Sequence, residues 1–215
     1  MPGSRGGVTI RAQSRRYTST DAIAWTFAGI VATHGDSPGQ EGACEHDVDF
    51  LADGRLICVY RTDGGDGYPD HRRAPFMKTT SSDDGKTWTK PVAMPDDVLS
   101  ARPQLLMATP TGPLLLTGGR PYLNLWASTD GLGERWDTYN IAARHNLGSD
   151  DYKFCDAFAN STSAWQGSTC YNSLQRVDGG DVLVCYDNVG TAPPAAPLEC
   201  QADPVTTFCM RVSVD

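Results

Sequence analysis

The octapeptide Ser81–Trp88 constrains the fold of this chain more than any other stretch. It reads S-S-D-D-G-K-T-W, and its residue types suit a tight turn between two β-strands. The side chains of Ser81 and Asp83 can hydrogen-bond to the backbone of the turn, and Gly85 can adopt a positive φ without steric cost. Trp88 supplies a large ring to pack beneath the turn, with an N–H that needs an acceptor. The octapeptide therefore predicts a strand–turn–strand unit.

The same pattern recurs further along the chain, in residues 123–136 (LNLWASTDGLGERW). This copy has one extra residue, so Gly131 and Gly133 are both candidates for the turn glycine. It keeps the serine, the aspartate and the tryptophan of the first copy as Ser128, Asp130 and Trp136. A worn copy without the glycine spans 18–25 and leads into an expected strand at 27–32.

Three β-hairpins are predicted where turn residues separate two apolar runs. Their turns lie at Asp53-Gly54, near Thr111-Gly112, and at Gly179-Gly180. The turns recur about every 60 residues, and a period of this size with four short strands is typical of the blades of a β-propeller. We therefore expect an all-β chain of about three four-stranded antiparallel blades, the first of them truncated.

The whole chain of 215 residues is expected to form one partial propeller domain. Its blade-like region spans about 18–187, a Pro/Ala-rich linker spans 192–203, and a last strand spans 208–214. Residues 137–168 are predicted to be a long polar loop, because they are rich in Asp, Asn and Ser. Helix signals are almost absent.

The net charge of −8 argues against a nucleic-acid partner, which needs a basic surface. An anionic ligand would have to be held by a local arginine cluster, against the repulsion from the net negative charge of the protein. No apolar run approaches the roughly 20 residues of a membrane span. The basic start of the chain has no apolar segment of a signal peptide, and localisation stays open.

Seven cysteines give an odd count. Cys58 and Cys185 lie within apolar strands and are expected to be free thiols in the core. Four others lie in or beside loops and would pair only in an oxidising compartment, as Cys155 with Cys170 and Cys200 with Cys209. The sequon 160–162 (Asn-Ser-Thr) has meaning only in a secreted protein.

Each hairpin closes with polar residues at its open end. Residues equidistant from a turn are neighbours on antiparallel strands. The resulting neighbours are Glu45 with Arg61, Arg102 with Arg120, and Tyr171 with Asp187. If the blades are alike, these open ends share one rim, opposite the hairpin tips. The alternative is that the strand ends are polar simply because they are exposed to water.

The turn motif is the Asp-box, and the chain resembles the sialidase (neuraminidase) superfamily of six-bladed propellers. The motif residues are Ser81, Asp83, Gly85, Thr87 and Trp88, repeated as Ser128, Asp130 and Trp136. The resemblance covers about residues 44–187 and implies the C-terminal half of the propeller. Asp-boxes also occur in propellers without catalytic activity, so the motif argues for the fold before the function.

The order Glu, Arg, Arg, Tyr carries the functional part of the resemblance. It implies that Glu45 is the catalytic glutamate, that Arg61 and Arg120 bind the substrate carboxylate, and that Tyr171 is the nucleophile. Asp187 matches the acidic residue that orients a further arginine. That arginine and the acid/base aspartate belong to earlier blades, and no residue here is assigned to either role. Arg102 has no family role, and the hairpin end at Arg120 is one residue longer than in the family.

The residue types suit an acidic sugar. Sialic acid carries a carboxylate on its anomeric carbon, arginine binds carboxylates in a bidentate manner, and a neutral tyrosine avoids the repulsion that a carboxylate nucleophile would meet. Tyrosine needs a base, which Glu45 would supply; Asp47 is an alternative polar anchor on the same strand. The sequence thus indicates a retaining exo-α-sialidase or a relative acting on another acidic sugar, without cofactor or metal. The alternative is a non-catalytic propeller that binds glycans or proteins.

Overall fold

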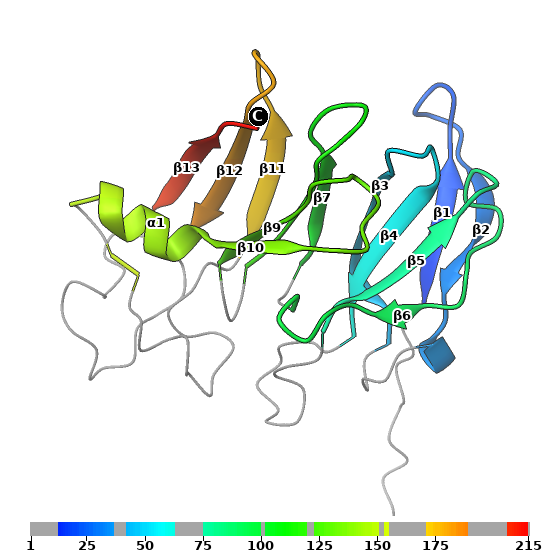
Figure 1. The fold of residues 1–215 in the computed structure, drawn as a ribbon. Coiled ribbons are helices and arrows are strands. Elements are labelled where there is room, and N and C mark those ends of the chain that lie inside the picture. The colour runs from blue at the N-terminus through cyan, green and yellow to red at the C-terminus, as the bar shows by residue number, and fades with distance from the viewer. Residues whose placement is uncertain are drawn as a thin grey trace, which may run out of the picture.

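The computed structural model describes residues 13–36, 42–62, 75–99, 102–119, 123–150, 153–154, 171–188 and 206–214. These residues form four antiparallel sheets (Figure 1). The first two sheets comprise β1 (Ser14–Thr18) and β2 (Thr26–Ala32), then β3 (Cys44–Phe50), β4 (Leu56–Arg61), β5 (Met77–Ser81) and β6 (Val92–Ala93). The other two comprise β7 (Gln104–Met107), β8 (Leu114–Gly118), β9 (Asn124–Ser128) and β10 (Asp137–Asn140), then β11 (Asn172–Arg176), β12 (Val182–Asp187) and β13 (Thr207–Val212). A short 3₁₀ turn, η1, spans His34–Asp36.

The sheets follow one another along the chain as the blades of a propeller do, which confirms the predicted fold class. Each of the last three sheets keeps its strands in sequence order, so strands that follow one another in the chain are antiparallel neighbours in the sheet. Two of these sheets have four strands and one has three. The described residues thus form one sheet more than the approximate count from the sequence, because β1–β2 stands apart from the β3–β6 sheet.

The three predicted hairpins are present with their turns at the predicted glycines. Phe50 pairs with Leu56 across the first turn, where Gly54 has a φ of 84°. Arg176 pairs with Val182 across the third turn, where both glycines of the Gly179-Gly180 pair have a φ of 88°. Only glycine adopts such angles without strain, and this local requirement made the turns visible in the sequence.

Three hydrophobic cores lie between successive sheets, and the middle strands serve two cores at once. In β8, Leu114 and Leu116 belong to the core shared with the β3–β6 sheet, whereas Leu115 belongs to the core shared with the β11–β13 sheet. Alternate side chains of a strand point to opposite faces. The run of buried residues in β8 therefore marks a blade that is covered on both faces.

The two turns with the Ser/Asp/Gly/Trp pattern have closely similar hydrogen bonds. In the Ser81–Trp88 turn, the Ser81 hydroxyl donates to Asp83 at 2.8 Å and accepts from the Gly85 N–H at 2.8 Å, and the Trp88 indole donates to the Gly85 carbonyl at 3.0 Å. Thr87 donates to Asp83 through its N–H at 2.9 Å and its hydroxyl at 2.6 Å.

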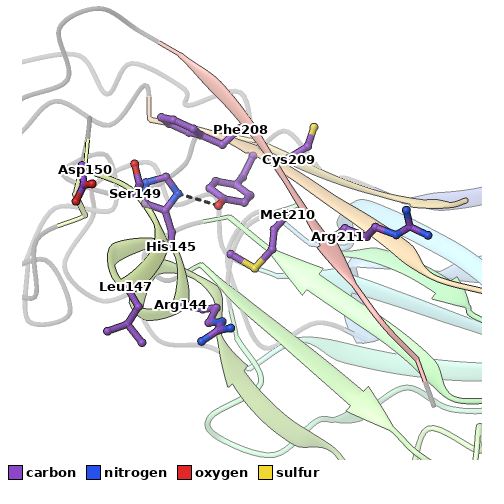
Figure 2. A pocket seen from close by; sticks show the side chains of 11 residues that line it. Arg144, His145, Leu147, Ser149, Asp150, Phe208, Cys209, Met210 and Arg211 are labelled. Carbon is purple, nitrogen blue, oxygen red and sulfur yellow. Dashed lines mark hydrogen bonds between the residues drawn. The ribbon is translucent and has the colours of Figure 1, made fainter.

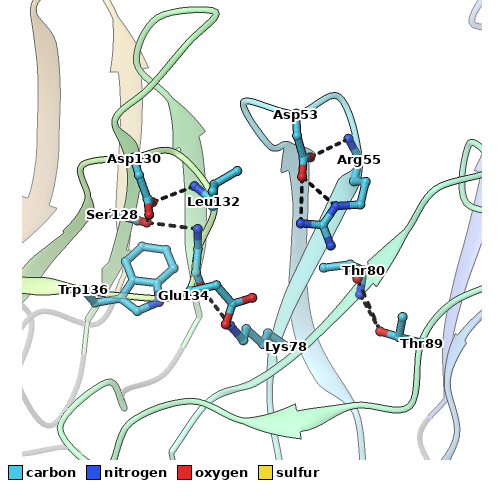
Figure 3. A network of polar contacts seen from close by, with 11 residues as sticks. Asp53, Arg55, Lys78, Thr80, Thr89, Ser128, Asp130, Leu132, Glu134 and Trp136 are labelled. Carbon is cyan, nitrogen blue, oxygen red and sulfur yellow. Dashed lines mark hydrogen bonds and ion pairs between the residues drawn. The ribbon is translucent and has the colours of Figure 1, made fainter.

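In the second turn, Ser128 takes the place of Ser81, and it accepts from the Gly133 N–H at 3.0 Å (Figure 3). Trp136 donates to the Gly133 carbonyl at 3.2 Å. Gly133, with a φ of 71°, is therefore the counterpart of the first turn's glycine, which decides between the two candidates that the sequence left open. Both tryptophan rings are partly buried against a core.

The worn copy also forms a turn, between β1 and β2. Asp21 accepts from the Ser19 hydroxyl and from the N–H groups of Ile23 and Ala24, each at 2.9 Å. The β1–β2 sheet lies close to the Ser81–Trp88 turn: a Cβ on Gly29 would come within 2.7 Å of two backbone oxygens of that turn. Trp25, in contrast, is 61% exposed.

One segment differs from its prediction. Residues 137–148, expected within a loop, form β10 and the helix α1 (Ile141–Gly148). Asn140 caps this helix, because its side chain accepts from the Ala143 N–H at 2.8 Å. The buried residues Ile141 and His145 are one turn apart and dock the helix. The N-cap asparagine and the spacing of four between Ile141 and His145 were present in the sequence, but the polarity of the segment outweighed them.

The cysteine prediction is wrong at one position and right at another. Cys185 is not a free thiol: it forms a disulfide with Cys209, its direct neighbour across β12 and β13, and this bond also overturns the predicted pairing of Cys209 with Cys200. Cys58 is free and buried in the core, where loss of hydration raises the pKa of its thiol. Cys155, Cys170, Cys200, the sequon and the whole of the predicted 192–203 linker lie outside the described residues. In the part that is described, no helix is long and apolar enough to cross a bilayer.

Candidate functional site

The first strands of three sheets lie side by side and run in the same direction (Figure 1). Asp47 and Asp49 of β3 accept from the N–H groups of Leu105 and Met107 of β7, at 2.8 and 2.6 Å. Because both partners advance by two residues, β3 and β7 run in parallel. Arg176, the last residue of β11, donates to the Met107 carbonyl at the end of β7.

The starting ends of β3, β7 and β11 therefore share one rim. The hairpin tips and the Ser/Asp/Gly/Trp turns lie at the opposite end, since Ser81 pairs with Leu56 next to a tip and Ser128 pairs with Leu114 next to another. The residues that precede or open the first strands are the sequence candidates Glu45, Arg102 and Tyr171. Arg61 and Asp187 end the second strands of their sheets at the same rim.

Glu45 and Arg61 form an ion pair in which Arg61 Nε lies 2.5 Å from Glu45 Oε2. The Arg61 side chain is 11% exposed and the Glu45 side chain 27%, so the pair is partly withdrawn from water. Glu45 lies where the β3–β4 register shifts between Cys44 and Asp47, and its φ is 40°. This bulge turns the carboxylate towards Arg61 although the backbone neighbour of Arg61 is Cys44.

Arg102 contacts both the glutamate and the tyrosine. Its backbone N–H donates to Glu45 Oε2 at 3.0 Å, and its guanidinium carbon lies 4.6 Å from the centroid of the Tyr171 ring. Its φ is 49°, and it precedes a proline. A non-glycine residue at positive φ costs about 1–3 kcal/mol, and such residues concentrate at functional sites. Two of the four in the described chain, Glu45 and Arg102, meet here.

Tyr171 and Asp187 complete the cluster. The Tyr171 N–H donates to Asp187 Oδ2 at 3.2 Å, which agrees with the β11–β12 register, in which Asn172 pairs with Tyr186. The Tyr171 side chain is 45% exposed, so its ring is open to solvent beside the arginine that covers it.

Contacts therefore link five residues in the order Arg61, Glu45, Arg102, Tyr171 and Asp187. Four of them are site residues predicted from the sequence, and the fifth predicted residue, Arg120, lies outside the described residues. The sequence placed Arg102 on the same rim as a strand-end arginine but gave it no role, and nothing in the sequence showed that it contacts both Glu45 and Tyr171.

Asp47, the alternative anchor, serves another purpose. Its carboxylate accepts from its own strand at Val48 and from Leu105 of the next sheet, at 2.9 and 2.8 Å. Burial raises the pKa of Asp47, because loss of hydration outweighs these backbone hydrogen bonds. Its contacts therefore hold adjacent sheets together below the rim.

A separate pocket of about 650 Å³ lies between α1 and β13 (Figure 2). His145 Nδ1 lies 2.9 Å from the Tyr186 hydroxyl inside it, and the His145 ring packs edge-on against Phe208 with centroids 4.7 Å apart. Burial raises the pKa of Tyr186 to about 12. None of the predicted site residues lines this pocket, and its aromatic cluster docks the helix on the last sheet. Among the described residues, no three side chains are grouped to hold a metal ion.

Comparison with solved structures supports the propeller-type fold described above. The chain is similar to a leech intramolecular trans-sialidase complexed with 2,7-anhydro-Neu5Ac, with a TM-score of 0.51 and 15% identity over 89% of this chain. It also matches the intramolecular trans-sialidase of Ruminococcus gnavus in complex with oseltamivir carboxylate, with a TM-score of 0.46 and 16% identity over 80% of this chain. No protein-family model matches the sequence, and no curated protein matches it significantly.

The likeness to the leech protein concerns the fold alone, which is a partial β-propeller of the sialidase type. The chain spans 26% of the leech protein's length and 32% of the Ruminococcus protein's length. What those proteins bind and catalyse is therefore not transferred to this chain by the comparison.

Proposed function

We propose that the rim cluster is part of the active site of an exo-α-sialidase-like glycoside hydrolase that releases sialic acid or a related acidic sugar with retention. One observation carries the proposal: Glu45, Arg61, Arg102 and Tyr171, which come from three sheets, are joined by contacts at one rim. A polar strand end that is merely solvated needs no such contacts and no strained backbone.

In this proposal Tyr171 is the nucleophile and Glu45 is its base. The phenolic oxygen of Tyr171 forms a bond to the anomeric carbon as Glu45 accepts the phenolic proton, and the glycosidic bond breaks. The leaving alcohol takes its proton from an acid that the family resemblance places in an earlier blade. Water then attacks the anomeric carbon from the face that the alcohol left, the glycosyl–tyrosine bond breaks, and Glu45 returns the proton to the Tyr171 oxygen. Two inversions restore both residues and retain the configuration.

Arg61 and Arg120 are proposed to bind the substrate carboxylate. Arg61 suits this role because its guanidinium is mostly buried and already lies against the Glu45 carboxylate. A guanidinium is planar and always charged, and its fork of N–H donors matches the geometry of a carboxylate. The contact with Glu45 thus fixes the direction of the arginine fork before the sugar arrives.

The test is Tyr171→Phe, which deletes only the hydroxyl. We expect turnover of a chromogenic sialoside to fall at least about a hundredfold, the lower end for loss of a catalytic group, with an unchanged melting temperature. Tyr139→Phe is the matched control, because Tyr139 is 53% exposed against 45% for Tyr171 but lies on β10. The assay is run on the 215-residue chain and on any longer natural form that contains it.

A fluorinated sialoside with slow hydrolysis should label Tyr171 and no other residue. Wild-type turnover in Tyr171→Phe, or labelling of a carboxylate, would end the assignment. Binding is measured in parallel: Arg61→Ala should weaken sialoside binding at least about tenfold, the effect of a lost charge-assisted hydrogen bond, whereas Arg55→Ala at a hairpin tip should not.

A non-catalytic glycan-binding propeller is the competing outcome. It predicts a sialoside affinity that depends on Arg61 but no turnover and no labelling in any form of the chain. A protein that binds a sialoside and its carboxamide analogue equally well would contradict both functions, because neither would then rest on the carboxylate.

A further inference from the structure

Arg102 is the one residue of the rim cluster to which neither the sequence pattern nor the family resemblance gives a role. It lies two residues before β7, which is the middle one of the three first strands. Its backbone and its side chain contact different partners: the N–H donates to Glu45 Oε2 at 3.0 Å, and the guanidinium carbon lies 4.6 Å from the centroid of the Tyr171 ring.

The backbone of Arg102 is strained, and this strained conformation directs its N–H and its side chain to different partners. A φ of 49° is unfavourable for any residue with a Cβ, and a residue before proline normally adopts an extended conformation. In an unstrained extended conformation the N–H and the side chain would take other directions. A residue that merely covers a strand end gains nothing from a strained backbone. The two contacts, with Glu45 and with Tyr171, therefore account for the strained conformation of Arg102.

The chemistry of the contact suits a tyrosine that gains negative charge. A guanidinium over the face of an aromatic ring is attracted by the ring's quadrupole. The attraction grows as the ring's oxygen loses its proton, because a fixed positive charge then faces a developing negative one. A contact that strengthens along the reaction accelerates the chemical step rather than substrate binding.

We propose that Arg102 is a positioning residue, which joins Glu45 to Tyr171 through its backbone and holds the Tyr171 ring for attack through its guanidinium. This inference rests on the proposed function of Tyr171. It assigns Arg102 a role distinct from that of the carboxylate-binding arginines, because its charge is directed to the nucleophile.

Arg102→Gly tests the role, since it removes the guanidinium and keeps the N–H that bonds to Glu45. Glycine adopts a φ of 49° without strain, so the melting temperature should stay equal or rise. We expect kcat, and the rate at which a fluorinated sialoside labels Tyr171 at saturation, each to fall about tenfold, which corresponds to about 1.4 kcal/mol. KM should change less than about twofold, and Arg102→Lys should restore part of the loss, because it keeps the positive charge.

Three results would overturn the inference. The first is a wild-type labelling rate at Tyr171 in Arg102→Gly, which would leave the proposed function of Tyr171 intact. The second is a tenfold rise in KM at unchanged kcat for the sialoside but not for its carboxamide, which would make Arg102 a carboxylate ligand. The third is a further fall in residual turnover when Arg102→Gly is added to Tyr171→Phe, since a residue that acts through the hydroxyl has nothing left to support. Wild-type turnover in Tyr171→Phe would instead refute the proposed function itself.

Discussion

At the scale of single residues, the Ser/Asp/Gly/Trp turns show how one carboxylate organises a loop. Asp83 accepts from the Ser81 hydroxyl and twice from Thr87. Hydrogen bonds from Thr87, followed by the bond from Ser81, lower the pKa of the Asp83 carboxyl from 3.8 to about 2. The ionised form is therefore the one that the folded turn requires.

This pKa predicts an acid-sensitive turn. The unfolded chain binds a proton at Asp83 near pH 4 and the folded chain only near pH 2. The stabilisation is therefore complete above about pH 4 and is lost as the pH falls through about 2. Asp83→Asn should lower the melting temperature at pH 7 and flatten its fall between pH 4 and 2, as measured by circular dichroism.

The control for that experiment is Asp84→Asn, which removes the same charge one residue along. Asp84 has a φ of 57°, a conformation that asparagine tolerates well, so this variant should keep the wild-type pH profile. Equal profiles for Asp83→Asn and wild type would show that the hydrogen bonds of Asp83 do not stabilise the fold.

At the scale of elements, neighbouring sheets are joined by specific polar and backbone contacts in addition to their cores. The first hairpin tip touches the second turn, where the Ala52 N–H donates to the Gly131 carbonyl at 3.0 Å. Lys78 of β5 reaches the same turn and donates to the Gly133 carbonyl at 2.6 Å and to Glu134 at 2.9 Å (Figure 3). These contacts set the distance between sheets at the end opposite the rim.

Close approach at Gly29 predicts where one sheet cannot tolerate a side chain. A Cβ there would lie 2.6 Å from the Lys86 carbonyl oxygen and 2.7 Å from that of Gly85, both backbone atoms that cannot swing away. Gly29→Ala should therefore destabilise the protein by about 1–3 kcal/mol, the range for overpacking. Denaturant unfolding measures it against Gly148→Ala, where a Cβ would meet nothing within 4 Å. Equal stability of both variants would contradict the close packing of β2 on the turn.

At the scale of the whole molecule, the β1–β2 sheet exposes an apolar surface. Tyr17, Phe27 and Ile30 are each between 45% and 52% exposed, and the rings of Tyr17 and Phe27 pack edge-to-face with centroids 5.7 Å apart. A two-stranded sheet is marginal by itself and leaves unpaired strand edges. Exposed aromatic groups beside such edges favour association with another protein surface.

We therefore expect the isolated 215-residue chain to self-associate at micromolar concentrations. Phe27→Ser should shift sedimentation towards the monomer, because it removes the exposed aromatic ring of β2. Phe50→Ser is the control, since Phe50 is 55% exposed but lies at the end of β3 next to a hairpin turn. A wild-type chain that sediments as a single cooperative monomer would contradict this expectation.

The sequence by itself determined the features that depend on a few adjacent residues. Glycines such as Gly54 and Gly85 allow backbone angles that other residues resist, so turns and strand order followed from local chemistry. The pairing of Tyr171 with Asp187 also followed from the sequence, because residues equidistant from a hairpin turn are neighbours on antiparallel strands. Helix α1 was missed although its cap at Asn140 is local, since a polar segment was interpreted as a loop.

The tertiary structure alone decided which residues meet across sheets. Glu45 reaches Arg102 only because β3 and β7 lie side by side, and Arg102 reaches Tyr171 only because β7 and β11 lie side by side. The disulfide between Cys185 and Cys209 likewise depends on the register of β13 against β12, 24 residues apart in the chain. Contacts of this kind depend on the packing of sheets through shared cores, which no short stretch of sequence encodes.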